Sequence, residues 1–244
     1  MIYYGYYSHI DGMFLVGITR FLYQRRVVMI LETGIMIENA ITYVKQIFAA
    51  DSSGHDYHHT IRVYRLAVEI AKENADMQIV QLAALLHDVD DAKLSPETYA
   101  SKRKAVDFMK DNGVDNEIIE TVCKIIEEVS FAGNDSVVPS TIEGKCVQDA
   151  DRLDAIGAIG IARAFAYGGS KGRKIYDPEI KPLINMSKKE YQQNQNSTIN
   201  HFYEKLLLLK DMMNTDAAKE KAWHRQFIME SYLEEFMAEW EGER

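Results

Sequence analysis

One segment of the chain runs Leu82-Ala83-Ala84-Leu85-Leu86-His87-Asp88, in which five apolar residues lead into an imidazole and a carboxylate. Val80, Ala83 and His87 are separated by three and four residues, which is the spacing of one face of an α-helix. We therefore expect His87 to lie on the apolar face that packs against the protein core. A buried ionisable group needs a partner or a metal ion, so the segment indicates a polar site within a helical core.

Two other segments also place ionisable groups on apolar helix faces. His59 shares a face with Val63, and Asp151 shares a face with Val147. Together with His87-Asp88, they bring two imidazoles and two carboxylates inward from three helices. This set suits one octahedral divalent ion such as Mn, Fe, Co, Ni or Mg, with positions left for water and a substrate oxygen.

Each signal has a simpler explanation when it is taken alone. A single histidine on an apolar face is more often a hydrogen-bonded core residue. A second His-Asp doublet occurs at His55-Asp56, and Asp151 could pair with an arginine. The occurrence of all the signals together, in this order, favours a metal site.

Helical spacing continues along nearly the whole chain after Met36, with no alternating strand pattern and no repeat of 20–50 residues. The sequence predicts one all-α domain, a helical bundle. The expected helices cover residues 37–48, 57–70, 80–87, 96–112, 118–129, 142–167, 199–209 and 222–240, and residues 168–196 show no clear period.

Composition narrows the range of partners. The chain has 244 residues, with 28 Lys and Arg against 37 Asp and Glu, a net charge of −9. Nucleic acids and anionic membranes bind clustered positive charge, so we expect neither as a partner. Cys123 and Cys146 form no disulfide framework and no metal-type pair, which favours the reducing cytoplasm.

Residues 1–35 differ from the rest, because they are rich in Tyr, Phe and Ile without a clean period. The apolar run at residues 12–23 is shorter than a membrane span, and Arg25 and Arg26 follow it, which is the wrong order for a signal peptide. We expect an N-terminal extension that arises from a start assigned too early, since Met36 opens a clean helical pattern. A disordered segment or a short amphipathic anchor is the alternative.

The order His59, His87-Asp88, Asp151 resembles the HD-domain metal-dependent phosphohydrolase superfamily, and the surrounding motifs are similar to its YpgQ/YedJ-like bacterial branch. The resemblance covers about residues 36–243. The supporting stretches lie at residues 54–63, 83–93, 148–157, 165–169, 175–178, 200–206 and 239–242.

The resemblance implies a single-domain HD-type helical bundle in residues 36–243. It also implies one divalent metal ion, with manganese favoured, held by His59, His87, Asp88 and Asp151. The activity that it implies is hydrolysis of phosphate esters or anhydrides by metal-activated water. For this branch, it suggests (deoxy)nucleoside triphosphates cleaved to the monophosphate and pyrophosphate.

The resemblance to HD nucleotidases places a catalytic carboxylate at Asp91, three residues after Asp88, and Asp88 is expected to be catalytic as well as a ligand. Arg62 and Lys93 are expected to bind phosphate oxygens. The alternatives are a solvated acid at Asp91 and surface ion pairs for Arg62 and Lys93. Asp154 lies near the face of Asp151 and is expected to hydrogen-bond a ligand histidine.

Asp149 lies about 200° around the helix from Asp151, and we expect it to face away from the site. The segment at residues 167–176 carries Lys171, Arg173 and Lys174, three cations that suit a polyphosphate tail. The alternative there is a helix cap followed by a solvated basic loop.

Competing functions are a nucleoside 5'-monophosphate phosphatase and a non-catalytic module that binds a metal or a nucleotide. A two-metal HD enzyme would need further histidines before the final aspartate. The chain has none between Val89 and Asn200, which favours a single ion. The base, the sugar and the oligomeric state, including a homodimer, stay open.

Overall fold

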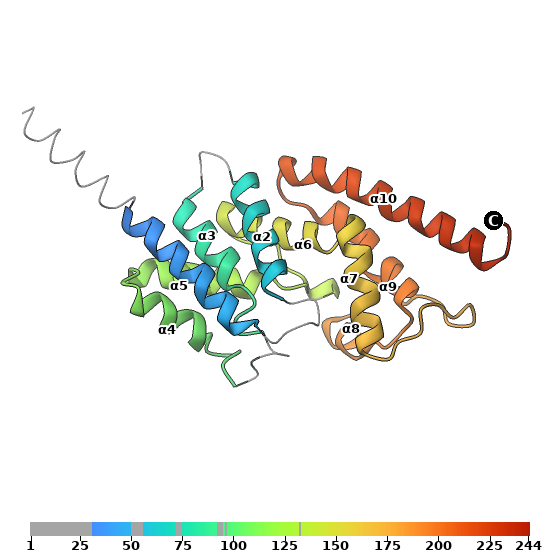
Figure 1. Ribbon diagram of the computed structural model, residues 1–244, viewed down its shortest axis with the longest axis horizontal. Coiled ribbons are helices and arrows are strands. Elements are labelled where there is room, and N and C mark those ends of the chain that lie inside the picture. The colour runs from blue at the N-terminus through green and yellow to red at the C-terminus, as the bar shows by residue number, and fades with distance from the viewer. Residues whose placement is uncertain (1–30, 50–55, 72–74, 92–94, 96, 132) are drawn as a thin grey trace, which may run out of the picture. The chain divides into compact units, whose positions relative to one another are not determined.

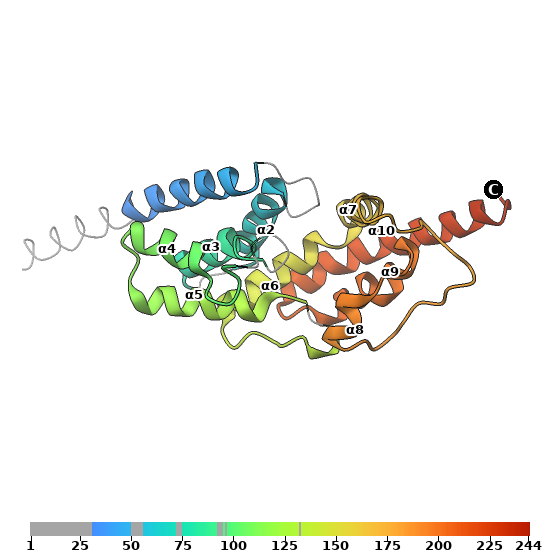
Figure 2. The same ribbon diagram turned by 90° about the horizontal axis from the view of Figure 1, so that it is seen from below.

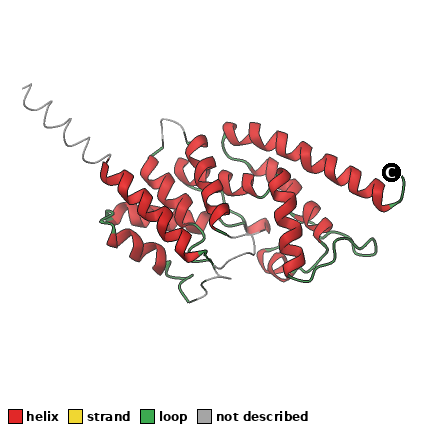
Figure 3. Ribbon diagram, viewed as in Figure 1, coloured by secondary structure: helices red, strands yellow, loops and turns green. Residues whose placement is uncertain are grey.

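The computed structural model describes residues 31–49, 56–71, 75–91, 95, 97–131 and 133–244. Every regular element in these ranges is a helix, so the all-α fold class is confirmed (Figures 1 and 3). The chain divides into Met1–Asn39 and a much larger unit, Ala40–Arg244. Because residues 1–30 lie outside the described ranges, the expected extension at residues 1–35 stays a prediction.

Residues 31–47 form a helix. The elements that follow are α2 (Tyr57–Ile70), α3 (Met77–Leu86), α4 (Arg103–Asp111), α5 (Asn116–Val129), the 3-10 turn η1 (Gly133–Asp135), α6 (Ile142–Asp154), α7 (Gly157–Ser170), α8 (Lys188–Gln193), α9 (Thr198–Glu204), the 3-10 helix η2 (Leu206–Met212) and α10 (Asp216–Trp240). None of the described helices is both long enough and apolar enough to cross a membrane.

Helix α6 is the centre of the larger unit. It packs against α2, α3, α5 and α10, and Figures 1 and 2 show it running between the α2–α5 helices and the α7–α10 helices. The consecutive residues Val147, Gln148, Asp149 and Ala150 are all fully buried. Because a run of four residues covers the whole circumference of a helix, α6 has no solvent-facing side at this point.

Asp149, expected to face away from the site, points not to solvent but to a second buried environment. It accepts hydrogen bonds from both the backbone and the side chain of Asn214 and of Thr215, at 2.7–2.8 Å. These residues precede α10. Asp149 thus attaches the start of the last helix to the central one.

Several expected helices have different bounds, and the fourth and sixth differ most. The fourth begins at Arg103, not near residue 96, and the Ser95 hydroxyl donates to the Val89 carbonyl oxygen. The buried carboxylate of Asp90 accepts hydrogen bonds from the backbone N–H groups of Lys104 and Ala105. These N–H groups lie in the first turn of α4, where the helix itself provides no acceptor.

The single helix expected over residues 142–167 is two helices, α6 and α7. The chain breaks at Gly157, whose φ of +77° disfavours any residue with a side chain. A Cβ atom there would also lie 3.0 Å from the Arg225 side chain. The break lets α7 leave in a new direction immediately after Asp154.

We expect Asp149→Asn to lower the free energy of unfolding by about 2–4 kcal/mol, because hydrogen bonds to a charged acceptor are weakened and buried donors lose partners. Urea denaturation measures the change. Asp216→Asn, at a 99% exposed side chain in the same region, is the control and should have little effect. Equal midpoints for the two variants would contradict the role assigned to Asp149.

Candidate metal centre

The site lies where α2 begins, where α3 ends and on the last turn of α6. Asp56 accepts a hydrogen bond from the backbone N–H of His59 at 2.7 Å, which caps α2 and places His59 in its first turn. His87 is the C-terminal cap residue of α3, and Asp88 follows it. Asp151 approaches both imidazoles from α6.

Four side chains converge on one point. The Nε2 atom of His59 lies 3.3 Å from Asp88 Oδ2 and 3.5 Å from Asp151 Oδ1. The Nε2 atom of His87 lies 3.3 Å and 4.0 Å from the same two oxygens. Neighbouring ligands of an octahedral ion with bonds of ~2.1 Å lie about 3 Å apart, and opposite ligands about 4.2 Å apart. The observed separations fit this geometry.

The outer ring nitrogens determine which lone pairs face the centre. His87 Nδ1 lies 2.9 Å from the Ala84 carbonyl oxygen, which can only accept, so this nitrogen carries a proton. His59 Nδ1 lies 2.7 Å from the carboxylate of Asp154 and donates in the same way. In the neutral form of both rings, which a metal ion requires, the Nε2 atoms present lone pairs to each other across 3.3 Å. Two facing lone pairs beside two carboxylates form a donor set that a divalent cation satisfies.

Burial and charge shape the properties of this donor set. The imidazoles of His59 and His87 are nearly inaccessible, whereas the Asp151 side chain is 28% exposed, so the site opens on the Asp151 side. Burial lowers the pKa of His87, but the charge and hydrogen bond of Asp88, together with the Asp151 charge, outweigh it and raise that pKa to about 9.

Two arginines, together with His59, hold Asp154 behind the site. Arg62 donates from Nε at 2.6 Å and from Nη2 at 3.0 Å, and Arg163 on α7 donates from Nη1 at 2.7 Å. Burial raises the pKa of Asp154, but hydrogen bonds from His59 and Arg62 and the charges of His59 and Arg163 hold this pKa well below its usual range. The contact of Arg163 with Asp154 was not predicted from the sequence.

The structure brings some predicted site residues together and leaves others apart. Among the described residues, donor atoms of His59, His87 and Asp88 all lie within 4.8 Å of one another, and Asp151 lies at the edge of this set. Asp91 is not among them, although its backbone N–H donates to the Asp88 carbonyl oxygen at 3.1 Å. Lys93 lies outside the described residues.

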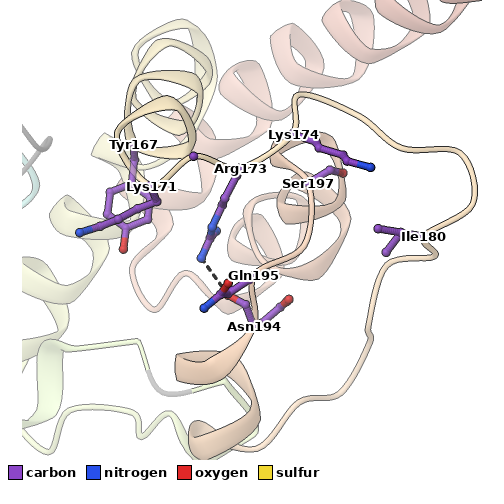
Figure 4. A pocket seen from close by; sticks show the side chains of 9 residues that line it. Tyr167, Lys171, Arg173, Lys174, Ile180, Asn194, Gln195 and Ser197 are labelled. Atoms are coloured by element: carbon purple, nitrogen blue, oxygen red, sulfur yellow. Dashed lines mark hydrogen bonds between the residues drawn. The ribbon is translucent and has the colours of Figure 1, made fainter.

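The three cations of residues 171–174 surround a pocket of about 390 Å³ with Tyr167, Gly172, Ile180, Asn194, Gln195 and Ser197 (Figure 4). Arg173 donates to the Asn194 carbonyl oxygen at 2.8 Å, and Lys174 pairs with Asp177 at 2.7 Å. The pocket lies at the C-terminal end of α7. The helix has 14 residues and is ~21 Å long, and Asp154 precedes its other end.

Known proteins resemble this chain over most of its length. A family model, the HD domain, matches residues 56–156. The Bacillus subtilis protein YpgQ is 44% identical over 199 residues, which are 80% of this chain and 89% of that protein. Its crystal structure in complex with ADP has a TM-score of 0.66 at 41% identity, covering 83% of this chain and 97% of that one.

Two further crystal structures have the same helical arrangement. An HD-superfamily hydrolase from Bacillus thuringiensis has a TM-score of 0.67 at 45% identity, with 86% of this chain and 98% of that chain covered. A protein from Lactobacillus plantarum has a TM-score of 0.77 at 41% identity, with 84% and 97% covered.

Metal affinity should depend on pH through His87. With a pKa of about 9, above its ordinary value of about 6.5, this side chain carries a proton at pH 7 that an ion must displace. Affinity for Mn²⁺ should rise about tenfold per pH unit between pH 7 and 8 and level off above pH 9. The same proton stabilises the metal-free fold below pH 6.5, and this contribution is lost as pH rises through about 9.

Titration calorimetry in buffers of different ionisation enthalpy measures the proton released on binding. We expect close to one proton per ion at pH 7. Release that is no greater at pH 7 than at pH 9.5 would contradict the assignment to His87.

We expect Asp88→Ala to abolish metal binding while the helical content is kept. Asp88 Oδ2 lies 3.3 Å from both Nε2 atoms, so its loss removes the carboxylate that links the two imidazoles. Elemental analysis and circular dichroism measure the outcome. Asp111→Ala, at an exposed position on α4, is the control and should bind metal normally. A metal-replete Asp88→Ala protein would show that the ion is held elsewhere.

Proposed function

Since this chain belongs to the HD-domain family of hydrolases, we propose that it is a divalent-metal-dependent phosphohydrolase that cleaves nucleoside triphosphates to the monophosphate and pyrophosphate. The observation that carries the proposal is the donor set of His59, His87, Asp88 and Asp151. In this set, the two ring Nε2 atoms lie 3.3–4.0 Å from the oxygens of the two carboxylates. We propose these four residues as the ligands, and manganese as the ion.

A nucleotide substrate is supported by one relative. YpgQ, at 44% identity, has been crystallised with ADP, a nucleotide that contains a phosphoanhydride bond. The free thiols of Cys123 and Cys146 fit the reducing cytoplasm that we propose as the compartment.

A bound divalent ion supplies a Lewis acid that polarises a phosphoryl oxygen and lowers the pKa of water. The chain supplies the remaining functions. The exposed side of Asp151 leaves the site open to a phosphate group. Asp91 lies one turn beyond Asp88, and we propose that its carboxylate accepts the proton of the attacking water.

The direction of the substrate follows from charge. The chain is acidic overall, and Lys171, Arg173 and Lys174 gather at one pocket. We propose that the α-phosphorus lies at the donor set and that the distal phosphates point toward this pocket. Its cations then act on them through charge and not through contact, because α7, at ~21 Å, is longer than a triphosphate chain. Water would then attack the α-phosphorus, and pyrophosphate would leave.

Arg62 is proposed as a further phosphate contact. Two of its nitrogen atoms, Nε and Nη2, already donate to Asp154, while 32% of its side chain is exposed. Its other N–H groups are therefore the ones that we propose to donate to a phosphate oxygen. Lys93, outside the described residues, is proposed for the same role on its sequence position alone.

Hydrolysis in ¹⁸O-labelled water tests which bond is cleaved. We expect the label in the nucleoside monophosphate and none in pyrophosphate, because attack at the α-phosphorus transfers the water oxygen to that group. Mass spectrometry of the products of the first turnover gives the answer. Label in orthophosphate would place the attack at the terminal phosphorus and remove the pyrophosphohydrolase proposal.

Replacing Arg173 tests the role of the pocket. We expect Arg173→Ala to lower kcat/KM several-fold for a nucleoside triphosphate and less for a monophosphate, because the triphosphate carries more negative charge toward the pocket. Lys181→Ala, at an exposed cation that does not line the pocket, is the control. Equal losses on both substrates would show that the pocket does not act on the phosphate tail.

A further inference from the structure

Asp154 is the most enclosed charge beside the donor set, with only 2% of its side chain exposed. Its Oδ2 atom lies 2.7 Å from His59 Nδ1, on the opposite side of the ring from the point where the four donors converge. A carboxylate in this position holds a ligand histidine in one tautomer and one ring orientation, and it increases the basicity of the nitrogen that faces the metal.

Two arginines from different helices hold this carboxylate in place. Arg62 on α2 contacts both carboxylate oxygens, at 2.6 Å and 3.0 Å, in the forked arrangement that gives guanidinium groups their directional preference. Arg163 on α7 contacts Oδ2 at 2.7 Å and the Asp154 backbone carbonyl oxygen at 3.3 Å. The carboxylate therefore has very few orientations available.

The helix break at Gly157 makes the second contact geometrically feasible. Arg163 lies two turns into α7, and its side chain returns to the end of α6. In a straight helix over residues 142–167, residues 154 and 163 would be ~13 Å apart along the axis. The orientation of His59 thus depends on how α7 packs, although α7 contributes no donor to the set.

A second buried carboxylate of α6, that of Asp149, shows that burial alone does not explain why Asp154 has two arginines and a histidine as partners. Asp149 is also fully buried, but its partners are neutral groups of Asn214 and Thr215. Those bonds join two helices without any contact to an imidazole. Asp154 differs because its partners are two cations and a candidate ligand.

We propose that Asp154 is a positioning residue that presents His59 Nε2 to the metal, and that Arg62 and Arg163 form a two-helix clamp on its carboxylate. The inference rests on the proposed metal site, but not on any particular substrate. Removing either arginine should loosen the carboxylate and weaken metal binding, even though neither arginine touches the ion.

Mn²⁺ affinity of the metal-free protein, measured by titration calorimetry without nucleotide, tests the proposal. We expect Asp154→Asn to weaken binding by about 10–100-fold, and Arg163→Gln and Arg62→Gln to weaken it by smaller, measurable factors. Arg163→Lys keeps the charge and one donor, so it should recover part of the loss. The two arginine variants also test the clamp if Asp154→Asn does not fold.

Two matched controls separate positioning from general stability. Asp149→Asn removes a buried carboxylate from the same helix, and Arg65→Gln removes an exposed arginine from the same face region of α2. Both should bind Mn²⁺ as the unmodified protein does, with Asp149→Asn unfolding at lower urea concentration. If Asp149→Asn weakened Mn²⁺ binding as much as Asp154→Asn, the role of Asp154 would be structural only.

A spectroscopic measurement follows the histidine directly. In the diamagnetic zinc-loaded protein, the His59 Nδ1–H proton should exchange slowly with water and give a distinct NMR signal, because Asp154 accepts from it. Faster exchange in Arg163→Gln would support the clamp, and unchanged exchange and affinity in all three variants would overturn it. Absence of nucleotide hydrolysis by metal-replete protein would instead reject the proposed function and leave this result intact.

Discussion

The contact between Asp154 and His59 links the fold of this protein to its site. A carboxylate with 2% of its side chain exposed is stable only when charged or hydrogen-bonded partners replace the water that it has lost. Here the partners are His59 and Arg62 from α2 and Arg163 from α7. The same bonds that make the buried charge tolerable also attach three helices to one another and orient a candidate metal ligand.

Other carboxylates of helix α6 also have partners on neighbouring helices. Asp149 joins it to the start of α10, while Asp151 and Asp154 serve the donor set. A central helix with polar residues on several sides would be unstable if any of them lacked partners. Each side of α6 therefore constrains a different neighbour, which explains how an apolar core can contain several carboxylates.

The donor set and the cationic pocket are located at opposite ends of α7. Arg163, in the middle of α7, reaches back to Asp154, and Tyr167, Lys171 and Arg173 form the pocket at the C-terminal end of the helix. The backbone around the pocket is fixed by hydrogen bonds from Thr198 and Ile199 to the carbonyl oxygens of residues 174 and 175. One rigid helix thus sets the distance between a candidate catalytic point and a candidate anion site.

The sequence by itself determined the helical class and brought His59, His87, Asp88 and Asp151 forward as one set, because helical spacing and the cost of burying ionisable groups are local properties of a chain. Tertiary structure decided the rest. The partners of Asp149 could not be predicted, because a helix-wheel argument assumes one buried face, and α6 is enclosed on all sides. Arg163 could not be predicted, because its contact with Asp154 requires the turn at Gly157, where a positive φ redirects the chain. Which partners a buried charge meets depends on how separate helices pack, and no spacing within one helix contains that information.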